Sequence, residues 1–321
     1  MEEIIQIDAD FINDNTSFKE LILAISEAFA SGNTIAPLRH HHDFPNPKIG
    51  EDSTLLLMPA WNPSESAGVK IVTVSPENGQ FDLPSINGAY IYMDATRGTI
   101  KAILEAKSLT AKRTAAASGL ASSFLSRKDA SSLLMIGTGT LSINLIKAHK
   151  SVRPITAVYV WGRNFKKALA VCDALGDEKI EAIPIQSIEE KISEVDIISC
   201  ATLSKVPLVF GKNLRSGQHV DLVGAYKKDM RESDDLAIQK SQVYLDTFQG
   251  GLKESGDIVQ PLEAGILQKE DVQADLFQLC SKINSGRKSN TDITLFKSVG
   301  HALEDLAAAK HYFEKYNDSL D

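Results

Sequence analysis

The sequence has few cysteines, and they lie far apart. Cys172, Cys200 and Cys280 form no CxxC pair in a chain of 321 residues, so the sequence predicts neither a disulfide framework nor a cysteine zinc site. We expect them to be small buried side chains in a protein of a reducing compartment.

Basic residues are not in excess, and no long apolar run is present. The chain has 34 Lys and Arg against 42 Asp and Glu, a net charge of −8, whereas nucleic-acid-binding domains usually carry a basic excess. No apolar run approaches the ~18 residues of a membrane span. The acidic start, MEEIIQIDAD, lacks the basic and apolar regions of a secretory signal. We therefore expect a cytoplasmic protein that binds neither nucleic acid nor membrane.

The order of the predicted elements indicates two domains, a number that the length also favours. The first third reads as mixed α and β. A helix is expected at 18–29 and strands at 54–58, 69–74 and 90–93, with a Pro- and His-rich loop at 36–50 and a PENG turn at 76–79.

From about residue 112, short apolar strands alternate with helical stretches, which is typical of a doubly wound parallel sheet. A helix at 113–126 precedes strands at 133–136, 158–161, 182–185, 196–200, 219–223 and 243–245. The segment 293–312 has the pattern of one long helix, which we expect to return to the first domain because six strands are already complete. The predicted domains are 112–296, and 1–111 with 297–321.

A glycine-rich turn follows the first strand of the second domain. This turn is the motif GTGTLS at 137–142. Gly137 permits a tight turn, Gly139 lets the backbone approach a pyrophosphate, and the small Ser142 stands where a third Gly or Ala is usual. The following helix would offer its N-terminal N–H groups to the anion. The whole motif, Gly137, Thr138, Gly139, Thr140, Leu141 and Ser142, is expected to bind a dinucleotide.

The end of the second strand favours NADPH over NADH. NAD-binding proteins place an acidic residue there for the ribose 2′-hydroxyl, but this chain has no Asp or Glu from Ala130 to Cys172. Arginine pairs well with a 2′-phosphate, although a solvated basic helix face would have the same composition. The expected contacts are Trp161, Gly162, Arg163, Asn164 and Lys167.

Three cations of the first domain have unusual surroundings. Arg39 lies in a loop, Lys70 stands inside an apolar strand, and Arg113 stands at the start of an Ala-rich helix, where its charge opposes the helix dipole. Each alone could be an ordinary surface charge. Together they suggest a clamp for an anionic substrate.

Two further polar groups have simpler explanations. The run His40–His42 cannot direct three side chains to one centre and has no carboxylate or cysteine at ligand spacing, so no metal site is predicted. Asp94 and Arg97 fall at an expected strand-to-helix turn, where capping and a local ion pair account for them.

Several blocks spread along the chain resemble the ornithine cyclodeaminase/mu-crystallin family. They are APLRH, LMPAW, GVKIVTV, DATRGTIKAILEA, LTAKRTAAASGLA, IGTGTLS, VYVWGRN and ITLFKSVGHALEDLAAA. The resemblance implies a homodimer with a Rossmann domain and a smaller α+β domain for substrate binding and dimerisation. It also implies that Arg39, Lys70 and Arg113 bind the substrate carboxylate.

The sequence departs from the cyclodeaminases of that family at two positions. Tyr226 stands where they carry a catalytic Asp, and Leu56 where they carry a carboxylate before MP, while Asp229 aligns with a structural turn. Without those carboxylates the site suits reduction of a cyclic imino acid, 1-pyrroline-2-carboxylate or 1-piperideine-2-carboxylate, to L-proline or L-pipecolate. Alternatives are an ornithine cyclodeaminase, a mu-crystallin-like protein that binds NADPH and a small anion, and reductive amination of a 2-oxo acid.

The remaining expectations concern the residues beside the substrate and the residues beside the nicotinamide. Met58 and Tyr226 are expected beside the substrate, and Asp292, Thr294 and Ser298 at the nicotinamide end. His301 is either a proton donor or a packed helix residue. Further expected cofactor contacts are Ala201, Thr202, Val223, Gly224, Ser298, Val299 and Gly300.

Overall fold

The computed structural model describes residues 4–320 and divides into two compact units. Unit 1 contains residues 1–113 and 301–321, and unit 2 contains residues 114–300. The expected boundaries were 111/112 and 296/297. Helix α3 (Ala106–Leu125) carries the first boundary, and the second follows the turn at Gly300.

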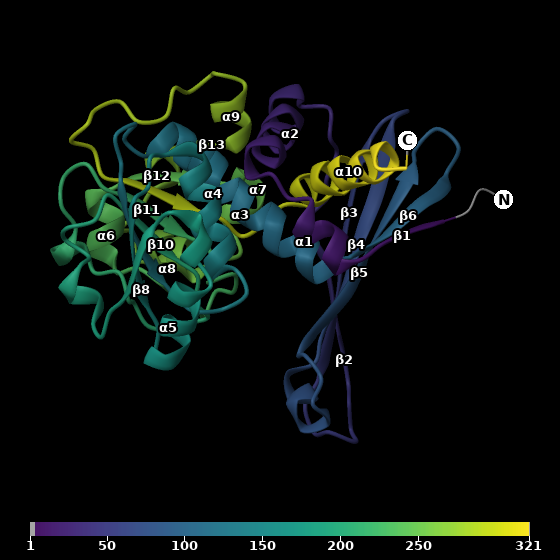
Figure 1. The fold of residues 1–321 in the computed structure, drawn as a ribbon, viewed down its shortest axis with the longest axis horizontal. Helices are drawn as coiled ribbons and strands as arrows, with labels where there is room; N and C mark the ends of the chain where they lie inside the picture. The colour runs from purple at the N-terminus through teal and green to yellow at the C-terminus, as the bar shows by residue number, and fades with distance from the viewer. Residues whose placement is uncertain (1–3, 321) are drawn as a thin grey trace. The chain divides into compact units, whose positions relative to one another are not determined.

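Unit 1 is built on a six-stranded sheet of order β1-β6-β5-β4-β3-β2, in which only the β1–β6 pair is parallel. The strands are β1 (Ile5–Ile7), β2 (His40–Phe44), β3 (Ser53–Asn62), β4 (Ser66–Val74), β5 (Ile86–Asp94) and β6 (Thr99–Glu105). The helices are α1 (Ala9–Asp14), α2 (Phe18–Ser31) and α10 (Ala302–Asp318). Helix α10 packs on β3 and β4, and α2 packs on α10. Strand β2 and the adjoining ends of its neighbours continue beyond these helices as an arm (Figure 1).

Unit 2 is a parallel eight-stranded sheet of order β13-β12-β14-β11-β10-β7-β8-β9. Its strands are β7 (Ser132–Ile136), β8 (Ala157–Trp161), β9 (Glu181–Pro184), β10 (Ile197–Cys200), β11 (His219–Leu222), β12 (Gln242–Leu245), β13 (Val272–Asp275) and β14 (Thr294–Lys297). Its helices are α4 (Ser142–Val152), α5 (Phe165–Asp173), α6 (Asp235–Lys240), α7 (Phe248–Gly251), α8 (Gly256–Glu263) and α9 (Leu276–Cys280). The central strands β7, β10, β11 and β14 are buried on both faces, as parallel strands between helices require. The expectation of a doubly wound Rossmann sheet is confirmed.

The chain leaves β7 toward β8 and β9 on one side and returns to β10 on the other side. This reversal leaves a crevice at the carboxyl ends of β7 and β10, which is where open α/β sheets bind ligands. Short 3-10 helices connect the elements at Pro76–Phe81, Gly176–Glu178, Ile188–Glu190, Gly211–Asn213 and Lys269–Asp271.

Several local expectations were wrong. The segment 293–312 is not one helix, because Thr294–Lys297 forms β14 between β11 and β12 and α10 begins only at Ala302. The sheet therefore has eight strands, including β13, which the sequence analysis did not identify. A four-residue buried strand has too few positions to show a period of two.

The turn near Asp94 and the loop at 36–50 also differ from expectation. Asp94 ends β5 and accepts hydrogen bonds from the backbone N–H groups of Thr96 and Arg97, so it closes a β5–β6 hairpin and caps no helix. The loop contains strand β2, which pairs with β3. The three cysteines are buried, as expected.

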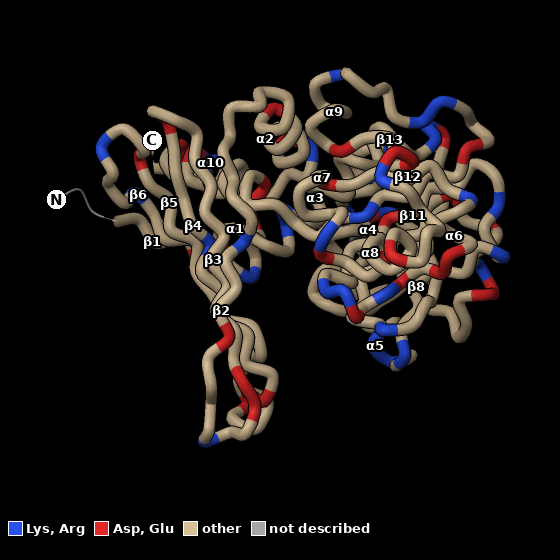
Figure 2. The backbone as a smooth tube through the Cα atoms, turned by 180° about the vertical axis from the view of Figure 1, so that it is seen from behind, with Lys and Arg blue, Asp and Glu red and all other residues tan. Residues whose placement is uncertain are grey.

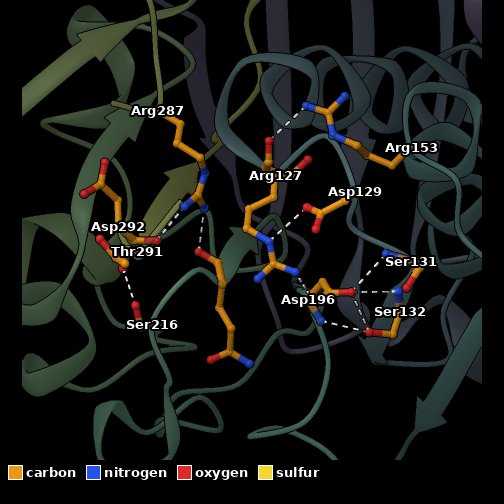
Figure 3. A network of polar contacts seen from close by, with 12 residues as sticks. Arg127, Asp129, Ser131, Ser132, Arg153, Asp196, Ser216, Arg287, Thr291 and Asp292 are labelled. Carbon is orange, nitrogen blue, oxygen red and sulfur yellow. Dashed lines mark hydrogen bonds and ion pairs between the residues drawn. The ribbon is translucent and has the colours of Figure 1, made fainter. Parts of the chain in front are cut away.

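Two arginines hold the C-terminal end of α3 at the amino edge of the unit 2 sheet (Figure 3). Arg153 Nη2 donates to the carbonyls of Ser122, Ser123 and Ser126 at 2.8–3.0 Å. Arg287 Nε donates to the carbonyl of Leu125 at 2.6 Å. Cations at this position satisfy the last carbonyls of the helix and complement its dipole.

Candidate active site

The glycine turn lies directly after β7, at the crevice. Gly137 has φ 122°, and a Cβ atom built there would lie 2.6 Å from the carbonyl oxygen of Ala201, so only glycine fits. A Cβ at Gly139 would meet nothing within 4 Å, and this glycine is exposed. The open backbone at Gly139 can therefore receive a ligand, as the motif predicted.

Helix α4 begins without a capping side chain. Leu141 at the N-cap makes no side-chain hydrogen bond to the helix, and the first turn holds no acidic residue. Ser142 is fully buried and donates its hydroxyl to the carbonyl of Gly137 at 2.9 Å, which fixes the turn against the helix. The N-terminal N–H groups and the positive end of the helix dipole suit a pyrophosphate. Thr138, Thr140 and Leu141 form the rest of this turn.

The end of β8 carries exposed cations. Arg163 and Lys167 are exposed, and neither has an ion-pair partner within the described part of the chain. Figure 2 shows Lys and Arg gathered around α5. Asn164 caps α5 by accepting a hydrogen bond from the N–H of Lys166. Trp161 Nε1 donates to the carbonyl of Gln186 at 3.2 Å.

A close contact brings the end of β8 against the glycine turn. A Cβ atom at Gly162 would lie 2.6 Å from Cγ2 of Thr138. The basic end of β8 and the glycine turn are therefore neighbouring parts of one surface.

The loops after β10, β11 and β14 form the other side of the crevice. Ala201 and Thr202 follow β10, Val223 and Gly224 follow β11, and the SVG turn follows β14. The sequence analysis missed Asp246, which is fully buried after β12. Its carboxylate accepts hydrogen bonds from Ser298 Oγ at 3.2 Å and from the N–H groups of Val299 and Gly300 at 2.7 Å.

The expectation that Asp292 and Thr294 line the nicotinamide end was wrong. Thr294 is the first residue of β14 and is fully buried, with its hydroxyl donating to the carbonyl of Leu125. Asp292 accepts from the N–H groups of Lys288 and Ser289. Because the strands are parallel, both residues lie at the amino edge of the sheet, opposite the glycine turn.

A cavity of about 640 Å³ lies at that amino edge, with five cations in its lining. Its arginines already donate to protein acceptors, namely the end of α3 and the carboxylates of Asp129 and Asp196. The cavity therefore belongs to the anchor of α3.

Unit 1 buries two of the three cations selected from the sequence, Lys70 and Arg113, and leaves Arg39 half-buried. Lys70 lies on β4 and is 3% exposed, and its Nζ is 2.9 and 2.8 Å from the two carboxylate oxygens of Asp305. Arg113 is 5% exposed, with Nε 2.8 Å from Asp305 Oδ1 and Nη1 2.6 Å from Glu304 Oε2. Arg113 is the eighth residue of α3, so its expected place at the start of the helix was wrong.

Electrostatics link all three cations. Burial, together with the charges of Arg113 and Arg39, lowers the pKa of Lys70 to about 8, although Asp305 acts in the opposite direction. Burial opposes the charge on Arg113, but Asp305 and Glu304 outweigh it and raise the pKa of Arg113. Burial also opposes the charge on Asp305, but Arg113 and Lys70 keep its pKa below the usual value.

The two carboxylates and a nearby tyrosine were missed from the sequence. Glu304 and Asp305 lie in the first turn of α10, where the helix dipole favours negative charge. Tyr90 on β5 is fully buried, faces Lys70 in the β4–β5 register, and its hydroxyl has no hydrogen-bond partner among the described residues. The available signal was two consecutive acidic residues at the start of a largely apolar helix.

The cluster joins two buried cations, Lys70 and Arg113, to the buried carboxylates of Glu304 and Asp305, whereas Arg39 is half-buried. Met58 is buried and stands opposite Lys70 on β3.

Other expected residues lie as follows. Leu56 is half-buried two residues before Met58 on the same strand. Tyr226 is half-buried in unit 2 with the ammonium of Lys227 5.7 Å from its ring, and the exposed Asp229 pairs with Lys205. His301 is the N-cap of α10, and its ring lies 6.4 Å from that of Phe29.

The histidine run lies on exposed strand β2, where successive side chains point to opposite faces. With Asp177 left aside, no group of three His, Cys, Asp or Glu residues placed to hold a metal ion occurs in residues 4–320. No helix in the same range is long and apolar enough to cross a membrane.

A parallel sheet with a glycine turn at its crevice defines a Rossmann-type dinucleotide-binding protein. Residues 2–319 match the ornithine cyclodeaminase/mu-crystallin family, and the chain belongs to it. It is 44% identical to an uncharacterized protein of Schizosaccharomyces pombe, over 93% of each chain. It is 34% identical to a Delta(1)-pyrroline-2-carboxylate reductase of Colwellia psychrerythraea, over 97% of this chain and 99% of that protein.

Solved structures share the whole fold. The Delta(1)-pyrroline-2-carboxylate reductase of Thermococcus litoralis, in complex with NADH and L-proline, superposes with a TM-score of 0.92 at 33% identity, covering 98% of each chain. An archaeal alanine dehydrogenase dimer with bound NAD gives a TM-score of 0.90 at 27% identity, covering 99% of this chain and 97% of that one.

Proposed function

We propose that this chain is an NAD(P)H-dependent reductase of cyclic imino acids, forming L-proline from 1-pyrroline-2-carboxylate or L-pipecolate from 1-piperideine-2-carboxylate. The observation that carries the proposal is a group of three cations in unit 1, in which Lys70 and Arg113 are buried against Asp305 and Glu304, and the half-buried Arg39 acts electrostatically on Lys70. The reductase relatives support the same reaction.

In this proposal the cluster holds the substrate carboxylate. Arg113 can spare donors for it, because the contacts to Glu304 and Asp305 use Nη1 and Nε. Lys70 adds a second contact and Arg39 a third. The reduced nicotinamide, when bound, supplies a hydride to the C=N carbon, and orientation by the clamp supplies most of the rate.

The cofactor side of the proposal rests on the fit of the glycine turn. Gly139 is open, the start of α4 has no competing cap or acid, and Ser142 fixes the turn. We further propose a preference for NADPH, because Arg163 and Lys167 are exposed beside this turn and pair with none of the carboxylates whose side chains the structure describes. The Thermococcus reductase, by contrast, is in complex with NADH, so the test compares the two cofactors directly.

Tyr226 and Leu56 favour a reductase over an ornithine cyclodeaminase, since neither can hold an ammonium or move a proton as a carboxylate does. We also propose a homodimer, in line with the dimer of the alanine dehydrogenase. Sedimentation at micromolar concentration tests the assembly.

The deciding experiment follows the loss of absorbance of NADPH, and separately of NADH, on addition of each cyclic imine. Oxidation of either cofactor supports the reductase. Arg163→Ala should weaken NADPH binding by about tenfold and leave NADH binding unchanged, because it removes a charge-assisted contact to the 2′-phosphate alone. Absence of turnover with both imines would favour a mu-crystallin-like binding protein, and ammonia release from ornithine would favour the cyclodeaminase.

A further inference from the structure

One buried carboxylate, Glu232, holds two of the loops at the crevice. Its Oε1 accepts hydrogen bonds from the N–H and the hydroxyl of Thr202, at 2.7 and 3.0 Å. Its Oε2 accepts from the N–H groups of Gly224 and Ala225, at 2.8 and 3.0 Å. Glu232 is fully buried and therefore acts through the backbone of these loops.

The two loops touch each other at backbone level. A Cβ atom at Gly224 would lie 2.0 Å from the carbonyl oxygen of Thr202. Any residue other than glycine at this position would therefore push the two loops apart. The adjoining residue Ala201 makes the same kind of contact with Gly137. A shift of either loop would therefore be transmitted to the glycine turn.

A second pair of charges fixes Glu232 itself. Lys297, the last residue of β14, places Nζ 3.5 Å from Glu232 Oε2 and 3.0 Å from Asp257 Oδ2. Asp257 Oδ1 accepts from the N–H of Glu232 at 2.8 Å. All three side chains are fully buried. A buried ionic cluster is seldom the most stable filling of a core, which directs attention to what it positions.

Strand order decides which half of a dinucleotide these loops would face. Strand β8, with Arg163 at its end, lies on one side of β7, and β10, β11 and β14 lie on the other. A dinucleotide spans such a crevice, with the adenosine ribose at the end of the second strand, here β8. The loops held by Glu232 then face the nicotinamide half.

We propose that Glu232, supported by Lys297 and Asp257, is a positioning residue for the nicotinamide half of the cofactor, acting through the backbone of Thr202, Gly224 and Ala225. This inference rests on the proposed function. It gives residues 230–233 (MRES), which contain Glu232, a role beyond that of a structural turn. Glu232 touches neither cofactor nor substrate in this scheme.

The test compares NADH with ADP-ribose, which lacks the nicotinamide, as ligands of the Glu232→Gln variant in calorimetric titrations. A Gln side chain keeps one acceptor but turns an NH₂ group toward backbone N–H donors, so it disrupts one of the two loops. NADH affinity should fall by about tenfold or more, and ADP-ribose affinity by less than about twofold. Asp196→Asn is the matched control, because Asp196 also accepts from backbone amides, those of Ser131 and Ser132, but at the opposite edge.

Each outcome has one meaning. If Glu232→Gln weakens both ligands equally, or neither, the positioning role is wrong. If the unaltered protein binds neither ligand, the proposed function fails and the inference fails with it. If Glu232→Gln does not fold, Thr202→Val removes one of the four bonds to Glu232, and an unchanged ratio of the two affinities in that variant would overturn the inference.

Discussion

Lys70 should give the enzyme a basic limb in its pH profile at an unusually low pH. Burial, together with the charges of Arg113 and Arg39, lowers the pKa of Lys70 from a usual 10.5 to about 8. The clamp needs the protonated ammonium to bind a carboxylate. Because kcat/KM reports the ionisation of the free enzyme, its decline should begin near pH 8.

The magnitude follows from the pKa. A group with a pKa near 8 keeps about one tenth of its protonated form at pH 9, whereas an ordinary lysine keeps nearly all of it. We therefore expect kcat/KM for the imine to fall about tenfold from pH 7 to pH 9 through this group alone. The limb in kcat should lie at higher pH, since a bound carboxylate stabilises the charged ammonium.

The assay measures kcat/KM of the unaltered enzyme and of Lys70→Arg from about pH 6 to about pH 10, which spans the expected limb. Arginine stays charged throughout, so the limb assigned to Lys70 should disappear, although activity at neutral pH will drop because the guanidinium is larger. Titration of the imine itself affects both enzymes equally. If Lys70→Arg loses kcat/KM with the same midpoint as the unaltered enzyme, the limb belongs to another group and the reasoning is refuted.

Three further predictions concern the cofactor turn and the amino edge of the unit 2 sheet. Gly137→Ala should lower the free energy of unfolding by about 2 kcal/mol or more and abolish NADH binding, because Gly137 has a positive φ and its Cβ would meet Ala201. Gly139→Ala should lose NADH binding but keep its stability, because Gly139 has open space around it. Thermal melts and NADH titrations of the two variants test both statements. Arg153→Ala should lower the free energy of unfolding, measured in urea, by about 2–4 kcal/mol, because it leaves carbonyls at the end of α3 without their donor. Its kcat/KM should be unchanged, and an unaltered unfolding midpoint would contradict the anchoring role. Burial opposes the charge of Asp196, but the N–H of Ser131, the hydroxyl of Ser132 and the charge of Arg127 lower its pKa overall. Its contribution to stability is therefore present above the unfolded value of about 3.9 and is lost as the pH falls through the folded pKa. Asp196→Asn should flatten this acid limb of the stability profile, and an identical limb in both proteins would argue against it.

The sequence predicted the parts of the site that depend on local order. The strand, the glycine turn and the following helix at 133–149 are consecutive in the chain, and their spacing alone defines the motif. Lys70 was noticeable because a lysine in an apolar strand is unusual. Arg113 was selected on a wrong premise, since the helix begins seven residues earlier, at Ala106, than the Ala-rich pattern indicated.

Partners far apart in the chain could not be predicted in this way. Asp305 lies 235 residues from Lys70, and Glu304 lies 191 residues from Arg113. The first turn of α10 resembles any acidic helix start until the helix packs on β4. The same holds for Glu232, whose contacts reach 30 residues back to Thr202 and 65 forward to Lys297.

The sequence by itself determined the class of the protein, through a glycine turn with its own strand and helix, a basic end of the second strand, and three cations in unusual surroundings. These features are encoded by neighbouring residues, because backbone conformation and short-range spacing are local properties. Only the tertiary structure decided that 294–297 is a central strand, that Asp292 and Thr294 lie at the opposite edge, and that buried carboxylates brace both the clamp and the crevice loops. The order of strands in a parallel sheet and the partners of buried charges both depend on contacts between residues far apart in the chain, so short-range patterns do not reveal them.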